Sequence, residues 1–141
     1  MKRQGMRTAC VAALVAAPAF LAGAEAVTLV GKGARLVLDG GGRGGVVSLK
    51  TPDGVELAAV DKVSQRVFSL TVSRQAEPPG ETIWVGDWDA HAFSVTQTAD
   101  SAATLTYADF SNGVERVVCT VSADPDGLDL RWRIEVVMRD G

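Results

Sequence analysis

Through most of its length this chain alternates apolar and polar residues with a period of two. Such a period places successive side chains on opposite faces of a strand and does not build the apolar stripe of a helix. Two short runs, 68–73 and 117–122, each supply a core face. In the longest run, one face carries Leu128, Leu130, Trp132, Ile134, Val136 and Met138, and the other carries Asp129, Arg131, Arg133 and Glu135. We predict that this run is a long strand with one dry face.

Turn-forming residues separate the apolar runs. Asp53-Gly54 and Asn112-Gly113 are suited to tight hairpins with positive φ, and the segment 124–127 is suited to a slightly longer one. Further strands are expected at Val27 to Val30, Ala34 to Asp39, Gly45 to Lys50, Val55 to Ala59, Glu81 to Val85, Ala92 to Thr98 and Ala102 to Ala108, with one helical turn at Val60 to Gln65. Short strands at this spacing predict an all-β fold, an antiparallel β-sandwich.

The first 26 residues have the pattern of a secretory signal peptide. A basic segment, Met1 to Arg7, precedes an apolar run from Ala9 to Leu21, and small residues follow at the expected cleavage site. We therefore expect the domain to be residues 27–141 and its location to be secreted or periplasmic. Cleavage removes Cys10 and leaves Cys119 alone, so no disulfide can form within the mature chain, and we expect Cys119 to be a small core residue.

Charge excludes two classes of partner. Removing the signal takes away three basic residues and one acidic residue, which changes the formal charge from −3 to about −5. Nucleic-acid binders need a basic footprint, and membrane-surface helices need a cationic amphipathic face. We therefore expect no nucleic-acid partner and no membrane contact after cleavage.

Two loops and the end of the printed sequence lead to further expectations. The glycine cluster at 40–45 lacks the Lys-Ser/Thr ending and the following helix of a phosphate-binding loop, so we predict a flexible connection. The segment 74–80 contains consecutive prolines and is predicted to be a loop. Because Arg139 to Gly141 is typical of the opening of another turn, we expect a sandwich that is incomplete at its C-terminus and belongs to the N-terminal part of a longer protein.

The best candidate for a site is the segment 84–91, which holds two of the three tryptophans and the only histidine. The candidate binding residues are Trp84, Asp87, Trp88, Asp89 and His91. If the segment is extended, its two carboxylates and imidazole share one side and could hold a divalent metal. If the tryptophans are exposed, their rings could stack on sugars. The third alternative is that the tryptophans fill the core and the carboxylates cap a turn.

Other catalytic patterns are weak. The acidic residues Asp124, Asp126 and Asp129 lack the ligand spacing of a calcium loop, and His91 has no Gly-x-Ser-x-Gly elbow as a partner. We assign no catalytic residue, no metal and no cofactor, and we expect this chain alone to be noncatalytic.

Five segments together resemble a known family: Leu36 to Asp39, Val46 to Lys50, Asp53 to Leu57, Val67 to Val72 and Leu128 to Ile134. The chain is similar to the galactose mutarotase-like β-supersandwich that opens large secreted glycoside hydrolases, including proteins similar to endo-α-N-acetylgalactosaminidases. The resemblance implies a carbohydrate-related context, in which this domain is a scaffold or an accessory sugar contact.

The leading hypothesis is a noncatalytic N-terminal module of a secreted carbohydrate-active enzyme, whose partners are a carbohydrate or a C-terminal catalytic domain. The alternative is a free-standing exported carbohydrate-binding or adhesion module. A mutarotase-like enzyme is a third interpretation, but it needs an acid and a base around one pocket, and the chain has a single histidine.

Overall fold

The computed structural model describes residues 26–58, 66–73 and 82–140. Nine strands follow one another along these residues: β1 (Val27–Val30), β2 (Arg35–Leu38), β3 (Val46–Lys50), β4 (Ser69–Ser73), β5 (Thr82–Gly86), β6 (Ala92–Ala99), β7 (Ala102–Ala108), β8 (Val114–Ala123) and β9 (Leu130–Met138). A 3₁₀ turn, η1 (Asp87–Asp89), lies between β5 and β6. The predicted helical turn at 60–65 and the predicted loop at 74–80 lie outside the described residues. So do residues 1–25 of the predicted signal peptide.

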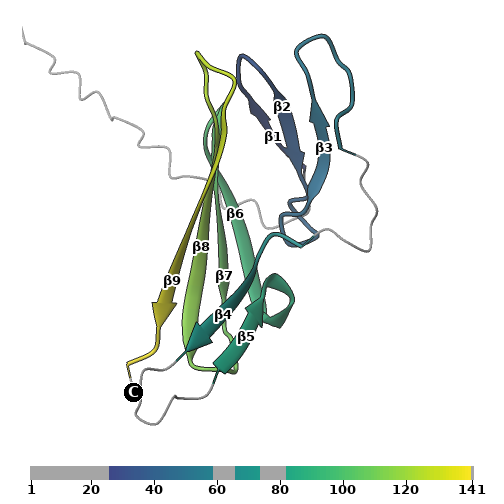
Figure 1. Cartoon of the computed structure of the whole chain (residues 1–141). Helices are drawn as coiled ribbons and strands as arrows, with labels where there is room; N and C mark the ends of the chain where they lie inside the picture. Colours follow the sequence, from purple (N-terminus) through teal and green to yellow (C-terminus); the bar gives the residue numbers. More distant parts are fainter. Residues whose placement is uncertain (1–25, 59–65, 74–81, 141) are drawn as a thin grey trace, which may run out of the picture.

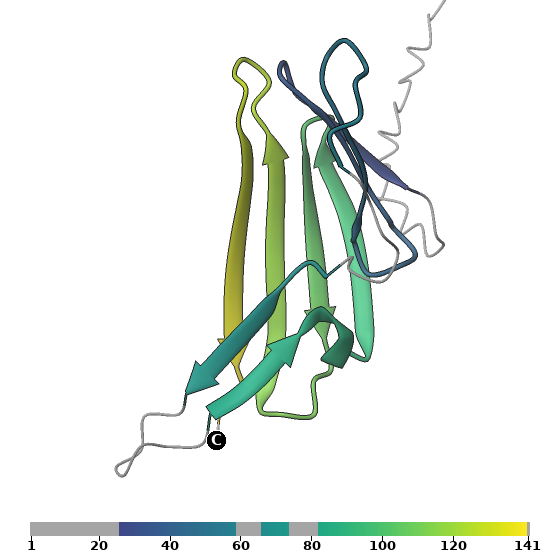
Figure 2. The same ribbon diagram turned by 45° about the vertical axis from the view of Figure 1, so that its right-hand side comes forward.

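The strands form three antiparallel sheets, in the orders β1-β2-β3, β4-β5 and β6-β7-β8-β9. The four-stranded sheet is one layer, and the two smaller sheets lie against the same face of it, β1–β3 near one end and β4–β5 near the other (Figures 1 and 2). The predicted all-β, antiparallel, sandwich-like architecture is confirmed. In the described ranges, no helix is long and apolar enough to cross a membrane.

The core lies between the layers and follows the period-two pattern. Alternate residues of β7 and β8 are buried, including Leu105, Tyr107, Val117, Cys119 and Val121. The smaller sheets contribute Leu29, Leu36, Leu38 and Val85, and Phe68 is buried directly before β4. Tyr107 is central, with its ring 5.0 Å from the rings of both Phe68 and Phe93. The predicted core faces at 68–72 and 117–121 are therefore confirmed.

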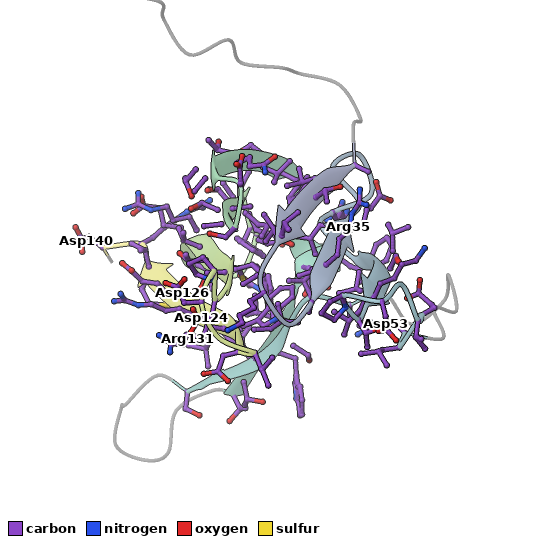
Figure 3. All side chains as sticks on the ribbon, turned by 90° about the horizontal axis from the view of Figure 1, so that it is seen from above. Arg35, Asp53, Asp124, Asp126, Arg131 and Asp140 are labelled. Carbon is purple, nitrogen blue, oxygen red and sulfur yellow. The ribbon has the colours of Figure 1, made fainter. Side chains whose placement is uncertain are left out.

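The turns also follow the sequence. Gly54 and Gly113 have φ of 89° and 85°, values that glycine adopts without a Cβ penalty. In the β8–β9 connection, Asp124 accepts a hydrogen bond from the Asp126 amide at 2.9 Å. The amides of Asp126 and Gly127 lower the pKa of Asp124, as expected for a carboxylate in a hairpin turn. Seen from above, Asp124 and Asp126 lie with Arg131 at this end of the sheet (Figure 3).

One predicted strand is wrong. In the described part of Val55 to Ala59 there is a single bridge, between Glu56 and Lys50, and no ladder. The turn at Asp53-Gly54 returns the chain so that the Glu56 carboxylate accepts hydrogen bonds from Ser48 Oγ at 2.5 Å and from the Leu49 amide at 2.8 Å. The Thr51 amide also donates to the Val55 carbonyl at 3.0 Å and the Leu57 amide to the Leu49 carbonyl at 2.7 Å, so backbone pairing is limited to this one bridge, and Leu57 stays exposed.

The dry face predicted for 128–138 is also wrong in part. Leu128 precedes β9 and is exposed, and Trp132 and Ile134 are 39% and 41% exposed, whereas Leu130, Val136 and Met138 pack against the core. β9 is an edge strand, and the second layer crosses it without covering its middle (Figure 2). The side chains share one face as predicted, but packing leaves part of that face open.

Cys119 is buried as predicted, and we expect its thiol to resist modification in the native protein. Burial, followed by the nearby charge of Asp87, raises its pKa from 9.0 to about 11, so little nucleophilic thiolate exists at pH 8. Because the folded state holds this proton more tightly than the unfolded chain, raising the pH from about 9 to about 11 should lower stability.

The measurement is the rate of reaction with a disulfide reagent at pH 8. A chain of residues 27–141, which contains Cys119 and lacks Cys10, should react within minutes in urea and far more slowly when folded. Thr120→Cys in a Cys119→Ala background places a thiol at the exposed neighbouring position and should react quickly without urea. Rapid labelling of native Cys119 would contradict this prediction.

Candidate functional site

The two candidate tryptophans are on the surface. Trp84 lies on β5 and is 72% exposed, and Trp88 lies in η1 and is 53% exposed. Tryptophan is usually well buried, so two exposed rings only four residues apart are unusual. The alternative in which both rings fill the core is therefore wrong, while its proposal that the carboxylates cap a turn is correct in part.

The carboxylates have structural partners. Asp89 Oδ2 accepts a hydrogen bond from the Gly86 amide at 2.7 Å, which closes the η1 turn. Asp87 is fully buried, and its Oδ2 accepts from the Val67 amide at 3.1 Å while Oδ1 has no partner among the described residues. Asp87 thus points into the fold, whereas Asp89 and His91 are exposed.

The segment is not extended, and the expected alignment of three ligands on one side is wrong. The 3₁₀ turn at 87–89 interrupts the period of two, so Asp87 turns inward and Asp89 bends back toward Gly86. Among the described residues, no three His, Cys, Asp or Glu side chains are grouped closely enough to hold a metal ion.

The outer face of the β4–β5 hairpin surrounds Trp84 with hydroxyl groups. Register places Thr71 directly opposite Trp84 and Ser73 opposite Thr82, and residues two apart on a strand share a face. The resulting face carries four exposed hydroxyl side chains and one indole: Ser69, Thr71, Ser73, Thr82 and Trp84. We call this set the hydroxyl face.

Arg43, a residue that sequence reasoning did not select, contacts Trp88 and the backbone of η1. The Arg43 guanidinium lies 5.5 Å from the centre of the Trp88 ring, in the geometry of a cation–π contact. Its Nη1 donates to the carbonyl oxygens of Asp87 at 2.6 Å and Ala90 at 2.7 Å, one at each end of the η1 segment. Arg43 therefore fixes the backbone that carries Trp88.

The glycine loop that carries Arg43 is itself tied to the core. Tyr107 Oη donates to the Arg43 carbonyl at 2.6 Å, and Asp39 Oδ1 accepts from the amides of Gly41 and Gly42. Burial, with smaller contributions from the charges of Cys119 and Asp87, raises the pKa of Tyr107, so the phenol remains a donor. A flexible connection does not describe this loop, which links the core to the candidate site.

The hydroxyl face had a signal in the sequence, because Ser69, Thr71 and Ser73 occupy alternate positions of a predicted strand. The role of Arg43 had no signal in the sequence, because the residues whose carbonyls it binds, Asp87 and Ala90, are 44 and 47 positions away. No family model matches this chain, and no curated protein or solved structure is significantly similar to it.

Proposed function

We propose that this domain is a noncatalytic carbohydrate-binding module that contacts glycan through Trp84 and Trp88. The observation that carries the proposal is the exposure of both rings, 72% and 53%, at two positions four residues apart. The apolar face of a sugar ring can stack on an aromatic side chain. The sugar hydroxyls and the indole N–H can then form hydrogen bonds with neighbouring polar groups.

The hydroxyl face supports this proposal. Ser69, Thr71, Ser73 and Thr82 each offer one donor and two acceptor positions around Trp84, which suits a ligand made of hydroxyl groups. Asp89 and His91, which follow Trp88 in the sequence, are also polar and exposed.

Preorganisation supports it as well. Arg43 holds both ends of η1, and Tyr107 holds Arg43, so Trp88 loses little freedom when a ligand arrives. The noncatalytic role agrees with the carboxylates, because Asp87 is buried and Asp89 closes the η1 turn.

The wider context is part of the proposal. The signal-peptide pattern at residues 1–26 suggests an exported protein, and the resemblance to the N-terminal supersandwich of secreted glycoside hydrolases suggests a carbohydrate-active enzyme whose catalytic domain would pack on this one. The assignment to an enzyme depends on that resemblance, and the contact with sugar depends on the exposed tryptophans.

A glycan array screened with the mature chain, followed by calorimetry with a soluble monovalent oligosaccharide, tests the proposal. Trp84→Ala and Trp88→Ala should each weaken binding about tenfold, the effect of losing one stacking contact of about 1.4 kcal/mol. Trp132→Ala is the matched control, because Trp132 is also partly exposed but lies on β9, outside the site.

Equal losses in all three variants would show that the effect is not local to this site. A glycan that binds Trp84→Ala and Trp88→Ala as well as the native domain would remove the site assignment. No binding to any glycan on a broad array would remove the function itself.

A further inference from the structure

β9 forms a free edge of the four-stranded sheet, since among the described residues it pairs only with β8. It is nine residues long, contains no proline and is regular, because the bulge in this pair lies on β8. Proteins usually protect such an edge from pairing with another chain. The opposite edge, β6, is protected by a register shift near Gln97, whose side chain also donates to the Thr28 carbonyl of β1.

Two hydrogen bonds establish which backbone groups of β9 are free. Asp129 O accepts from the Asp124 amide at 2.8 Å, and the Arg139 amide donates to Gly113 O at 3.0 Å. Backbone groups alternate in direction along a strand, so odd-numbered residues from 129 to 139 bond toward β8. The even-numbered residues, 130 to 138, direct their N–H and C=O groups to the open edge.

The two faces of β9 differ in chemistry. The core-facing side carries Trp132 and Ile134, which the second layer leaves 39% and 41% exposed. The opposite side carries the exposed Arg133 and Glu135, and neither forms a salt bridge within the described part of the chain. An open ladder, uncovered apolar side chains and unpaired charges therefore occur together at the middle of one strand.

We propose that two copies of this chain pair through β9 as an antiparallel dimer whose two-fold axis passes beside Ile134. In that register all nine residues of each strand are paired, and Ile134, whose backbone groups face outward, meets its own copy in a hydrogen-bonded pair. The two sheets join into one continuous eight-stranded sheet.

Charge selects this register. Residues that face one another have numbers that sum to 268, so Arg133 of each copy lies opposite Glu135 of the other. A centre at Arg133 would oppose the two Arg133 side chains, and a centre at Glu135 would oppose the two Glu135 side chains. Opposite charges stabilise a directly facing pair, and like charges destabilise it.

The same register joins the uncovered apolar surfaces. Trp132 of one copy lies opposite Val136 of the other, on the core-facing side, and the two Ile134 side chains meet at the axis. The exposed middle of β9 in each copy is thereby covered by the middle of β9 in the other. A second copy fits this edge in backbone direction, charge and apolar contact.

Sedimentation equilibrium of the mature chain over a range of concentrations tests the proposal, with circular dichroism to confirm folding. The native chain should dimerise, and Arg133→Glu or Glu135→Arg alone should weaken the dimer about tenfold or more because each opposes like charges twice. The double variant should restore it. Lys50→Glu, on the exposed surface of β3, makes the same charge change as Arg133→Glu away from β9 and should have no effect.

Mixing the two single variants is the sharpest arm. A copy with Arg133→Glu and a copy with Glu135→Arg present complementary charges at both facing positions, so a heterodimer should form where neither variant self-associates. A native chain that stays monomeric at all concentrations would overturn the proposal. So would a dimer that both single variants leave unchanged, because its interface would lie elsewhere.

Discussion

Replacing Gly44 with alanine is expected to lower the free energy of unfolding by about 3 kcal/mol, from backbone strain and steric overlap together. Gly44 is buried and has φ of 78°, which L-residues with a Cβ rarely adopt. A Cβ there would lie 1.9 Å from Leu105 Cδ2 and 3.0 Å from Tyr107 Oη. Leu105 and Tyr107 would have to move away from the glycine loop to make room for the added Cβ.

Gly54→Ala separates the two causes. Gly54 has a similar φ of 89°, but a Cβ added there would meet nothing within 4 Å, so only the backbone strain of about 1 kcal/mol is expected. Urea unfolding followed by tryptophan fluorescence measures both variants. Equal losses at Gly44 and Gly54 would show that the contact with Leu105 contributes nothing.

A second experiment changes Leu105, the residue that a Cβ at position 44 would contact. Leu105→Ala by itself should destabilise the core by about 3 kcal/mol, but combined with Gly44→Ala it removes the atom that clashes. The double variant should therefore lose clearly less than the two single losses added together, as expected for residues in contact. Simple additivity would contradict the proposed steric cause.

The sequence predicted the strands well because their signal is local. The bounds of β1 and β7 agree with the structure at both ends, and β2, β3, β5 and β6 differ by a single residue at one or both ends. Each strand of this kind has a period-two pattern and an adjacent turn former, both of which can be seen within about ten residues. The segment at Val55 lacked a partner for its apolar residues, and no local pattern reveals that.

Local sequence patterns could not predict which strand residues the second layer covers. Trp132 and Ile134 follow the same alternation as Cys119 and Val121, which lie opposite them in register. Only the position of the second layer decides that the β8 residues are buried and the β9 residues are half open. Alternation identifies a face of a strand but does not say what covers it.

The candidate site was found by composition and corrected by geometry. Clustering of Trp84 and Trp88 with His91 pointed to a segment whose two indole rings are exposed, but the extended conformation assumed for it was wrong at Asp87. The residue that organises the segment, Arg43, comes from a loop that looked like a plain glycine connection. Contacts across more than forty residues determine its role.

Arg43→Ala is the second substitution with a large expected effect, a loss of about 3 kcal/mol. The guanidinium donates to two backbone carbonyls, and hydrogen bonds from a charged donor are worth more than neutral ones. Alanine would leave the Asp87 and Ala90 carbonyls without this donor and would remove the contact with Trp88. The η1 turn should loosen, and tryptophan emission should shift.

Arg43→Gly distinguishes the side chain from its backbone. Arg43 has φ of 67°, so the native residue adopts a left-handed conformation that costs about 1 kcal/mol and that its hydrogen bonds offset. The Arg43→Gly variant loses the same contacts as Arg43→Ala but has no backbone strain at position 43. If the extra conformational entropy of glycine in the unfolded chain has a small effect, Arg43→Gly should be about 1 kcal/mol more stable than Arg43→Ala.

Arg35→Ala is the control for both substitutions at position 43, because Arg35 is an exposed arginine on β2 (Figure 3). It should change the unfolding free energy by less than about 0.5 kcal/mol, as is usual for surface positions. If Arg43→Ala were as mild as Arg35→Ala, the two hydrogen bonds to the η1 segment would not hold Trp88 in place. The aromatic surface that we propose binds glycan would then lack this support.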